Sequence, residues 1–421
     1  MSHFNVGKDI SHESILMMKI ISKLRDHFSR PDVPFIFLWI VMFMIVFSDA
    51  LSWPTVPYLI RDFLVEEPAV VAALGLLTSA FNLIKIAANI LGAFLGDKFD
   101  RGFIILLALT LFPASFALLL FARDHLWVLG SYILFGIFYG ILMPPLNAMV
   151  ASLTKRKPKG ILFGIFNLSW ILSQIPAPII GGFLSKTVFL RFPLVLSLAL
   201  SFIILILFIT FRRILRRAPS PHQSTHENKY STKPTTEKLF LLCLAQFFSG
   251  LGNGVLSPLI TAYLIYVIGA SPAEMGIAYS LGWGLATAVA QIPGGKLSDR
   301  FGYKQVIIAS TLVGAPLILL LPFSGSLVHF TLINALSCIS GNLASPAFSA
   351  YVAALMGRSL SRGFGLTSAS FSIGSIVGPI IGSFLWSIFE PNYFPPFAAS
   401  TTFLLLTLPF IIVLKSEARN H

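Results

Sequence analysis

Two ionisable side chains, Asp49 and Lys85, lie inside apolar segments that are long enough to cross a membrane. A charge at the centre of a membrane helix costs about 2.5–3.5 kcal/mol, so such residues face a cavity or a partner. Asp49 follows Phe35 by 14 residues and Lys85 precedes Asp97 by 12, which is about 21 Å and about 18 Å of helix rise. We therefore expect both charges near mid-membrane and at similar depth.

Three interpretations of these two charges stay open. Asp49 and Lys85 could form an ion pair that breaks when Asp49 is protonated, which would link a proton to a change of conformation. They could instead form a static structural pair. In the third interpretation, Lys85 binds an anionic group of a small molecule.

Polar side chains recur at helical spacing beside these charges and in other apolar segments. Thr78, Asn82 and Asn89 share one helix face with Lys85. Three further stripes are Asn167, Trp170 and Gln174; Gln246, Ser249, Asn253 and Ser257; and Ser280, Trp283, Thr287 and Gln291. Each residue alone could make an interhelical hydrogen bond, but their shared periodicity predicts a pocket for a mostly neutral or amphiphilic molecule.

Composition places the chain among membrane proteins with many spans. Of its 421 residues, 56% are hydrophobic and 11% are charged, whereas soluble domains carry about 25% charged residues. Twelve segments approach the roughly 20 apolar residues that a helix needs to cross a bilayer: 35–60, 70–95, 103–122, 126–152, 161–185, 190–211, 239–268, 274–296, 303–323, 328–356, 363–389 and 394–414. The runs are too long for barrel strands, so the predicted fold class is all-α with twelve transmembrane helices.

Basic residues predict the orientation of these spans. Cytoplasmic loops carry an excess of Lys and Arg. With the N-terminus inside, 25 of the 30 basic residues fall on the inner side, four fall outside and the remaining one is Lys85. Both termini are therefore predicted in the cytoplasm. The net charge of +13 reflects this orientation and not nucleic-acid binding, because it is spread over seven separate segments.

The longest polar stretch divides the chain into two halves. It is rich in Ser, Thr, Pro and charge, which is typical of a flexible linker. The predicted domains are a cytoplasmic N-terminal segment at 1–34, six-helix bundles at 35–211 and 239–414, the linker at 212–238 and a tail at 415–421. Within the first segment, residues 10–28 have apolar positions at helical spacing and could lie on the membrane surface or be a disordered tail.

The two halves contain an internal repeat. GAFLGDKFDRG, from Gly92, aligns with GGKLSDRFGYK, from Gly294, at an offset of 202 residues. GIFNLSWILSQIPAPIIGG, from Gly164, aligns with GLTSASFSIGSIVGPIIGS, from Gly365, at an offset of 201. Matching segments at nearly one offset predict parallel halves of six helices each, related by an axis along the membrane normal.

These motifs resemble the major facilitator superfamily, and the resemblance covers residues 35 to 414. The family's loop motif, Gly-x-x-x-Asp-Arg/Lys-x-Gly-x-Arg/Lys-Arg/Lys, resembles Gly295, Asp299, Arg300, Gly302 and Lys304. The first copy keeps Asp97, Lys98 and Arg101 but departs at Ala93, Asp100 and Gly102. The fifth-span signature of the family's antiporters resembles Gly365, Gly374, Gly378, Pro379 and Gly382 in the eleventh span. These small residues could equally serve close helix packing alone.

The resemblance implies a cytoplasmic gate in which Asp97 and Asp299 meet helix N-termini or basic residues of the opposite half. The residues assigned to this gate are Asp97, Lys98, Arg101, Asp299, Arg300, Lys304 and Arg362. The basic ones could also serve only to set topology. Trp53, Pro54 and Pro57 resemble the first span of drug-type antiporters, and the prolines would loosen that helix. The Arg-x-x-Gln-Gly of the family's fourth span is replaced here by Gly136, Tyr139 and Gly140, which weakens the prediction of proton antiport.

We predict a secondary transporter in the cytoplasmic membrane of a prokaryote that works by alternating access. It would export small amphiphilic compounds in exchange for protons, as a monomer without a cofactor. The residues assigned to substrate or proton are Asp49, Lys85, Asn82, Asn89, Gln174, Gln246, Asn253, Trp283 and Gln291. An importer or uniporter of a sugar, a carboxylate or another metabolite stays an alternative, as does a sensor of the same fold that transports nothing. No cluster of His, Asp and Glu lies within the spans and no nucleotide loop follows a strand, so we expect neither an enzyme nor a metal site.

Overall fold

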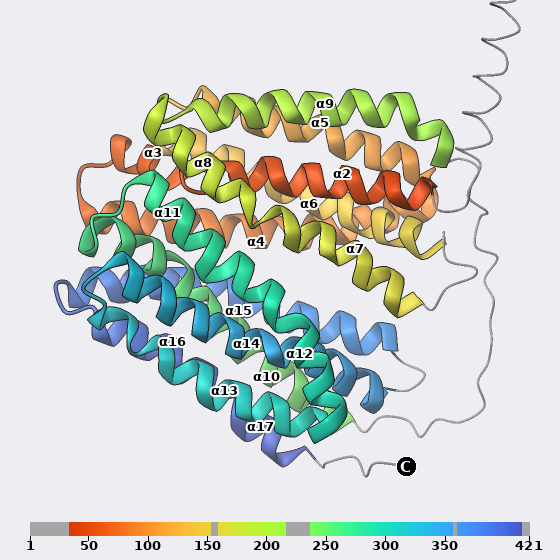
Figure 1. Cartoon of the computed structure of the whole chain (residues 1–421). Coiled ribbons are helices and arrows are strands. Elements are labelled where there is room, and N and C mark those ends of the chain that lie inside the picture. Colours follow the sequence, from red (N-terminus) through yellow and green to blue (C-terminus); the bar gives the residue numbers. More distant parts are fainter. Residues whose placement is uncertain (1–32, 153–158, 216–235, 357–359, 415–421) are drawn as a thin grey trace, which may run out of the picture.

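The computed structural model describes residues 33–152, 159–215, 236–356 and 360–414, and every regular element within these ranges is a helix (Figure 1). The first half contains α2 (Val33–Ser52), α3 (Val56–Phe63), α4 (Glu67–Lys98), α5 (Arg101–Leu120), α6 (His125–Ser152), α7 (Lys159–Ser173), α8 (Pro176–Thr187) and α9 (Phe192–Leu215). The second half contains α10 (Thr236–Ala262), η1 (Tyr263–Val267), α11 (Pro272–Tyr279), η2 (Ser280–Leu285), α12 (Ala286–Phe301), α13 (Tyr303–Ile318), η3 (Leu321–Phe323), α14 (Leu327–Met356), α15 (Leu360–Phe389), α16 (Phe394–Leu405) and α17 (Thr407–Val413).

Eleven helical segments of the described chain are long and apolar enough to cross a membrane. The twelfth predicted span, 274–296, corresponds to the run of α11, η2 and α12 from Pro272 to Phe301, which is less apolar because it includes Gln291, Pro293 and Lys296. The predicted all-α membrane fold is therefore confirmed. The predicted surface helix at 10–28 and most of the linker at 212–238 lie outside the described residues.

Local sequence explains where several helices begin. Asp124 precedes α6 and accepts hydrogen bonds from the backbone N–H groups of Leu126 (2.8 Å) and Trp127 (3.2 Å), which satisfies donors that a helix start leaves unpaired. Ser271 and Glu274 form a reciprocal capping box at the start of α11. Short capped loops at these places let consecutive helices run antiparallel.

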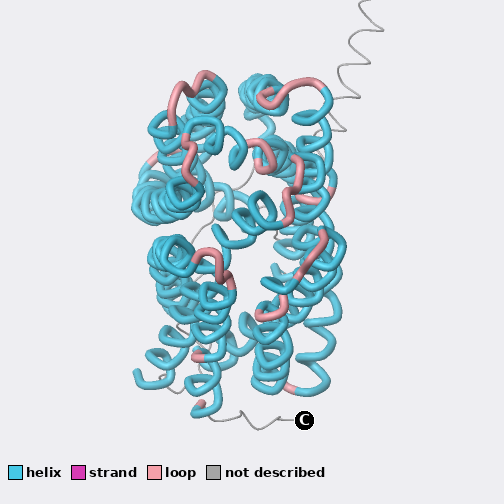
Figure 2. Tube along the Cα trace, turned by 90° about the vertical axis from the view of Figure 1, so that its left-hand side faces the viewer, coloured by secondary structure: helices cyan, strands magenta, loops and turns pink. Residues whose placement is uncertain are grey.

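The two halves lie side by side, with α2 to α9 above and α10 to α17 below in Figure 1. We call the end where α2 begins and α9 ends the linker end, at the right of Figure 1, and the opposite end the far end. Figure 2 looks at the far end, where the loops between helices α5 and α6 and between η1 and α11 lie. Helices α4 and α8 of the first half pack against α15 and α11 of the second.

The internal repeat is visible in how the halves are packed. Gly92 in α4 lies against the backbone of Gly140 and Ile141 in α6, and Gly294 in α12 lies against Leu343 and Pro346 in α14. The corresponding loops differ, however. Gly302 adopts a φ of 95°, a conformation that favours glycine, whereas Asp100 at the equivalent place instead caps α5 by accepting the N–H of Phe103 (2.8 Å). The departure of the first loop motif is thus a change of turn type.

The glycines of the fifth-span signature make close backbone contacts. In α15, Gly374, Gly378 and Gly382 lie against the backbone of α10, where an added Cβ would overlap main-chain atoms. In α8, Gly181 lies against Leu51 of α2 in the same way. These contacts account for the small residues by close packing between the first and fifth helices of each half.

Several side-chain hydrogen bonds join the halves in the part of the molecule nearer the far end. Ser79 donates to the carbonyl of Ile376 (2.7 Å) and Ser383 donates to that of Val71 (2.9 Å). The indole of Trp386, which is fully buried, donates to the Glu67 carboxylate (3.0 Å). Tyr58 donates to the carbonyl of Ala270. Gly182 and Gly276 also lie against backbone atoms of the opposite half in this part of the molecule, so the far end is the closed one.

Gly276 provides a test of this closure, because a Cβ there would overlap the carbonyl oxygen of Pro178 in the other half. We expect Gly276→Ala to destabilise the closed far end by about 1–3 kcal/mol, as overpacking does elsewhere. A cysteine placed at the buried Ser280, after replacement of Cys243 and Cys338, should then react several-fold faster with a maleimide.

The control for this measurement is Gly164→Ala, since no atom lies within 4 Å of a Cβ at that position. Equal labelling rates in the two variants would contradict a closure that depends on close backbone contact.

Candidate functional site

Three interrupted helices meet at the boundary between the halves. The first span breaks at residues 53–55, where Pro54 lacks an N–H, so the predicted loosening of this helix is confirmed. The fifth span breaks at residues 174–175 between α7 and α8, and the eighth span widens into η2. Gly284 of η2 lies against the carbonyl of Gln174, and the indole rings of Trp53 and Trp283 lie 5.5 Å apart. Such irregular backbone inside a membrane protein is tolerated where it borders a cavity.

A cavity of about 360 Å³, here called the aromatic pocket, lies within the first half beside this boundary. Its volume is within the range of small-molecule sites. Six of its side chains are aromatic, and it also contains one acidic and one basic group. Its lining residues are Asp49, Ser52, Trp53, Phe81, Lys85, Asn89, Tyr132, Phe135, Tyr139, Met143 and Trp170.

The two predicted charges line this one pocket but do not form an ion pair with each other. The hydroxyl of Tyr139 donates to Oδ2 of Asp49 at 3.0 Å. The amine of Lys85 lies 5.0 Å from the centre of the Phe81 ring, a cation–π contact. Within the described part of the chain, no carboxylate lies within ion-pair distance of Lys85. The carboxylate therefore has a resident hydrogen-bond donor, while the amine has only an aromatic face.

A second cavity of about 930 Å³, here called the polar cavity, lies mainly in the second half. It shares Trp53 and Tyr132 with the aromatic pocket, so the two cavities adjoin. Its lining is rich in hydroxyl and amide side chains from α10, α13, α14 and α15, and it contains no charged side chain. The pair of cavities thus offers a charged aromatic compartment and a neutral hydrogen-bonding compartment.

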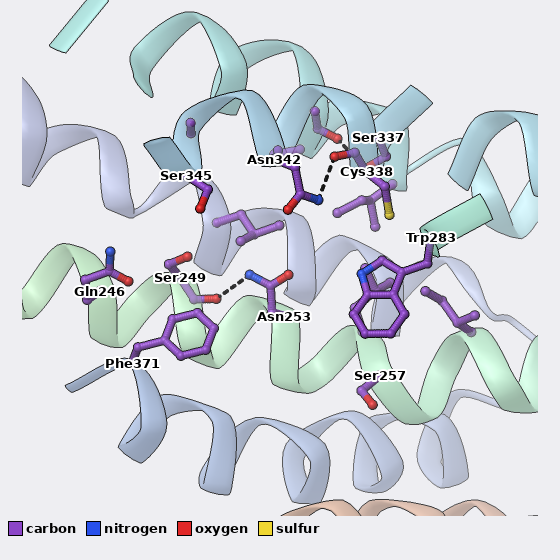
Figure 3. Close-up of a pocket in the computed structure, with 18 of the residues that line it drawn as sticks. Gln246, Ser249, Asn253, Ser257, Trp283, Ser337, Cys338, Asn342, Ser345 and Phe371 are labelled. Carbon is purple, nitrogen blue, oxygen red and sulfur yellow. Dashed lines mark hydrogen bonds between the residues drawn. The ribbon is translucent and has the colours of Figure 1, made fainter. Parts of the chain in front are cut away.

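Figure 3 shows how the predicted stripe of α10 faces the polar cavity. Gln246, Ser249, Asn253 and Ser257 all line it, and Asn253 donates to the carbonyl of Ser249 (2.8 Å). Trp283 of η2 lies opposite this stripe and is 42% exposed, so its indole face is accessible in the cavity. The predicted stripe residues of α10, together with Trp283, therefore line a cavity.

A further polar stripe, which was not predicted from the sequence, lies on α14. Asn334, Ser337, Cys338, Asn342 and Ser345 line the polar cavity from this helix, and Asn342 donates to the carbonyl of Cys338 (2.9 Å). Asn334, Cys338, Asn342 and Ser345 follow one another at spacings of four, four and three residues, which is the same signal that identified the other stripes. It could have been found in the tenth span. Tyr139 carried no such signal, because only the fold brings it to Asp49.

Three predicted site residues lie away from both cavities. Asn82 donates to the carbonyl of Thr78 (3.0 Å) and contacts that of Ser375 (3.5 Å) in the other half. Gln174 is buried in the break of the fifth span, and its side-chain nitrogen has no hydrogen-bond partner among described residues. Gln291 lines neither cavity. Asn82 therefore sits in the contact between the halves, because α15 covers that part of α4.

The family of the chain follows from its similarity to known proteins. The family model of the Major Facilitator Superfamily matches residues 38–241 and 242–421. The chain belongs to the Major Facilitator Superfamily. It is a multi-pass membrane transporter and not an enzyme. The two matches meet close to the boundary between the two halves.

Curated relatives of this superfamily member include proteins of two bacteria. Multidrug resistance protein 1 of Bacillus subtilis is 24% identical over 381 residues, which cover 90% of this chain and 95% of that protein. Quinolone resistance protein NorA of Staphylococcus aureus is 25% identical over 356 residues, which cover 83% and 89%. Both alignments extend over most of the two chains.

Solved structures show the same fold. A bacterial homologue of the human lysosomal transporter Spinster, in an inward-facing and occupied conformation, superimposes with a TM-score of 0.76 at 18% identity and covers 91% of this chain and 96% of that one. The human organic anion transporter MFSD10 superimposes with a TM-score of 0.64 at 18% identity, over 90% and 98%. At these identities the likeness concerns the fold alone.

The predicted gate residues of this superfamily member lie at the linker end, where the halves are apart. Asp97, Lys98, Asp299 and Arg300 are exposed, and Arg101 is half-buried. The amine of Lys98 lies over Phe94 (5.0 Å) and the guanidinium of Arg300 over Phe301 (5.3 Å). The side chain of Arg362 lies outside the described residues.

Lys304 differs from the expectation for a gate residue. Its amine donates to the carbonyls of Ile412 and Leu414 (2.7 Å each), at the end of α17 in its own half. A cation is favourable there because helix carbonyls are unpaired at a C-terminus. In this conformation Lys304 therefore anchors the last helix within the second half.

The hydrogen bond from Tyr139 to Asp49 can be measured by a double-mutant cycle. With Tyr139→Phe, Asp49→Asn and the double variant, we expect a coupling of about 1–2 kcal/mol in unfolding free energy. This is the upper part of the range for interhelical hydrogen bonds in membranes, because the acceptor is a carboxylate.

The matched control replaces Tyr132, which lines the same pocket and makes no hydrogen bond among described residues. Tyr132→Phe should show no coupling to Asp49→Asn. A coupling of the same size there, or none at Tyr139, would contradict the assigned interaction.

Proposed function

We propose that this superfamily member is a proton-coupled exporter of small amphiphilic compounds that acts as a monomer in the cell membrane. The observation that carries the proposal is the pair of adjoining cavities, one aromatic with a single carboxylate and one polar and uncharged. An amphiphilic molecule could place its apolar ring among the aromatic side chains and its hydrogen-bonding groups against α10 and α14.

The names of the relatives support export over import. Both curated relatives described above are named for resistance, to multiple drugs in one case and to quinolones in the other. Resistance of a cell to a compound is consistent with removal of that compound. The identities of 24% and 25% leave the particular substrate of this chain to experiment.

Asp49 is the proposed proton site. It is the carboxylate of the aromatic pocket, and it lies one turn before the break of the first span next to Trp53. The Tyr139 hydroxyl donates to a charged carboxylate. Protonation of Asp49 neutralises this carboxylate and so weakens the charge-assisted hydrogen bond. A change of that bond would act on the broken helix that contacts η2 through Trp53 and Trp283, and so on the contact between the halves.

Alternating access follows from the closed far end. If the linker end is cytoplasmic, as the distribution of basic residues predicts, the described conformation faces inward. Rocking of the two halves would separate α8 from α11 and α4 from α15, and would bring the loops of Asp97 and Asp299 toward the opposite half. In this proposal the gate residues act in the outward-facing state, where the linker end is closed.

Flux through purified protein in liposomes tests the coupling. In the wild type, a pH gradient should drive concentrative movement of an amphiphilic dye. Asp49→Asn should reduce this concentrative movement at least tenfold, whereas dye exchange measured in the absence of a pH gradient should be unchanged. The reason is that an amide cannot carry the proton.

Asp62→Asn is the control, because Asp62 is an exposed acidic residue of α3 at the far end. It should transport like the wild type. Flux that is indifferent to pH would identify a uniporter. Absence of flux for any tested solute, including sugars and carboxylates, would favour a sensor.

The orientation has its own test. A green fluorescent protein fused after His421 should fluoresce in intact bacteria, and alkaline phosphatase fused at the same point should be inactive, because both report a cytoplasmic C-terminus. Fusions in the loop at Gly325, which is at the far end, should give the opposite pattern. Active phosphatase at the C-terminus would mean that the linker end is outside the cell, so that the described conformation would be outward-facing.

A further inference from the structure

The aromatic pocket holds one negative and one positive group that do not neutralise each other. Asp49 and Lys85 line the same cavity of about 360 Å³ without an ion pair between them. Opposite charges in a low-dielectric site attract strongly, so leaving both without an ionic partner in a membrane span is costly. A bound molecule with complementary charges would recover that cost.

The surroundings of the two charges restrict what that molecule can be. The pocket that holds them is lined largely by aromatic side chains, with Phe81, Phe135, Tyr132 and Trp170 among the lining residues. Aromatic walls favour a flat aromatic body by stacking and edge-to-face contact. Lys85 has no acceptor from the described residues, so its three N–H donors are available for a carboxylate. The Asp49 carboxylate accepts hydrogen bonds from the Tyr139 hydroxyl and from the Trp53 side chain, and because its two oxygens offer about four acceptor sites, it can still accept an ammonium group.

We propose that the aromatic pocket binds a zwitterionic aromatic compound, with its carboxylate facing Lys85 and its ammonium group facing Asp49. This inference rests on the proposed function, because it takes the aromatic pocket to be a substrate site. It assigns Lys85 to specificity for the anionic group. It also explains how exchange for protons would occur, because the ammonium group of the compound and a proton would compete for the same carboxylate.

A purely anionic or a purely cationic compound fits this pocket less well. An anion would meet the uncompensated charge of Asp49, and a cation would meet that of Lys85. Each mismatch leaves one buried charge without a partner, which is the costly arrangement in binding sites as in protein interiors. Preference for the zwitterion over both single-charge analogues is therefore the signature of the site.

Equilibrium binding of a matched ligand series tests the assignment. The probes are 6-(aminomethyl)-2-naphthoate, which is zwitterionic, its carboxamide, which is cationic, and 6-methyl-2-naphthoate, which is anionic. With the full-length protein in a neutral detergent, calorimetry should show the zwitterion binding about tenfold tighter than either analogue, which corresponds to about 1.4 kcal/mol.

Two substitutions should remove the two preferences separately. Lys85→Gln should abolish the preference over the cationic carboxamide and keep the preference over the anion. Asp49→Asn should do the reverse. The controls Lys296→Gln and Asp62→Asn remove exposed charges outside both cavities and should keep both preferences. Met143→Trp, which fills the pocket, should weaken all three ligands together.

Stability of the ligand-free protein provides a second readout. Because Lys85 has no ionic partner among described residues and contacts only the Phe81 ring, Lys85→Gln should melt no lower than Phe81→Leu, which removes the same cation–π contact. A melting temperature below that of Phe81→Leu would indicate an ionic partner of Lys85 and would overturn the proposal. So would equal binding of the three probes by the wild type, or a preference over the carboxamide that survives in Lys85→Gln.

The binding test is independent of the transport test. It uses no membrane and no gradient, so loss of proton coupling in liposomes would leave the assignment of the pocket intact. Conversely, a wild type that concentrates amphiphilic dyes when driven by a pH gradient but shows no preference for the zwitterion would retain the proposed function and lose this inference.

Discussion

Close backbone contact between the two halves at the far end is the constraint on which the rest of the structure depends. Glycines at positions 75, 182 and 276 bring α4 and α8 against α15 and α11 where no Cβ would fit. Side-chain hydrogen bonds then reach carbonyls of the opposite half, as from Ser79 and Ser383. Among the described residues these close contacts lie toward the far end, and the aromatic pocket of the first half and the polar cavity, which lies mainly in the second half, adjoin at Trp53 and Tyr132.

The interrupted helices follow from the same arrangement. A continuous helix satisfies its own backbone groups, so it needs no neighbour for that purpose. The breaks at residues 53–55 and 174–175 and the widened turn η2 occur where the halves come together, and the freed backbone groups gain partners there. Ser280 donates to the carbonyl of Ile175, which lies in the break of the fifth span. The breaks also bring Trp53 and Trp283 into contact between the cavities.

The halves repeat in packing but differ in chemistry. Gly92 and Gly294 occupy equivalent contacts, yet the first half encloses Asp49, Lys85 and an aromatic lining, while the lining of the second half is uncharged and rich in hydroxyl and amide groups. Such a division suits a molecule with one charged aromatic end and one neutral polar end. It also places the charge that could respond to a proton in one half, next to the contact that must change when the halves rock.

The sequence by itself determined the class of protein, the helical spans, the two repeated halves and the stripes of α10, because apolar run length and helical spacing are local properties. It also placed Asp49 and Lys85 at similar depth, and both line one pocket. Only the tertiary structure decided their partners. Tyr139 reaches Asp49 from 90 positions away, and Asn82 is covered by α15 and not exposed to a cavity, because contacts between helices depend on how the bundles rotate and tilt. Whether the gate residues of the two halves meet depends on which end of the molecule is closed. The spacing of residues along the chain does not reveal this, because the same chain can adopt more than one conformation.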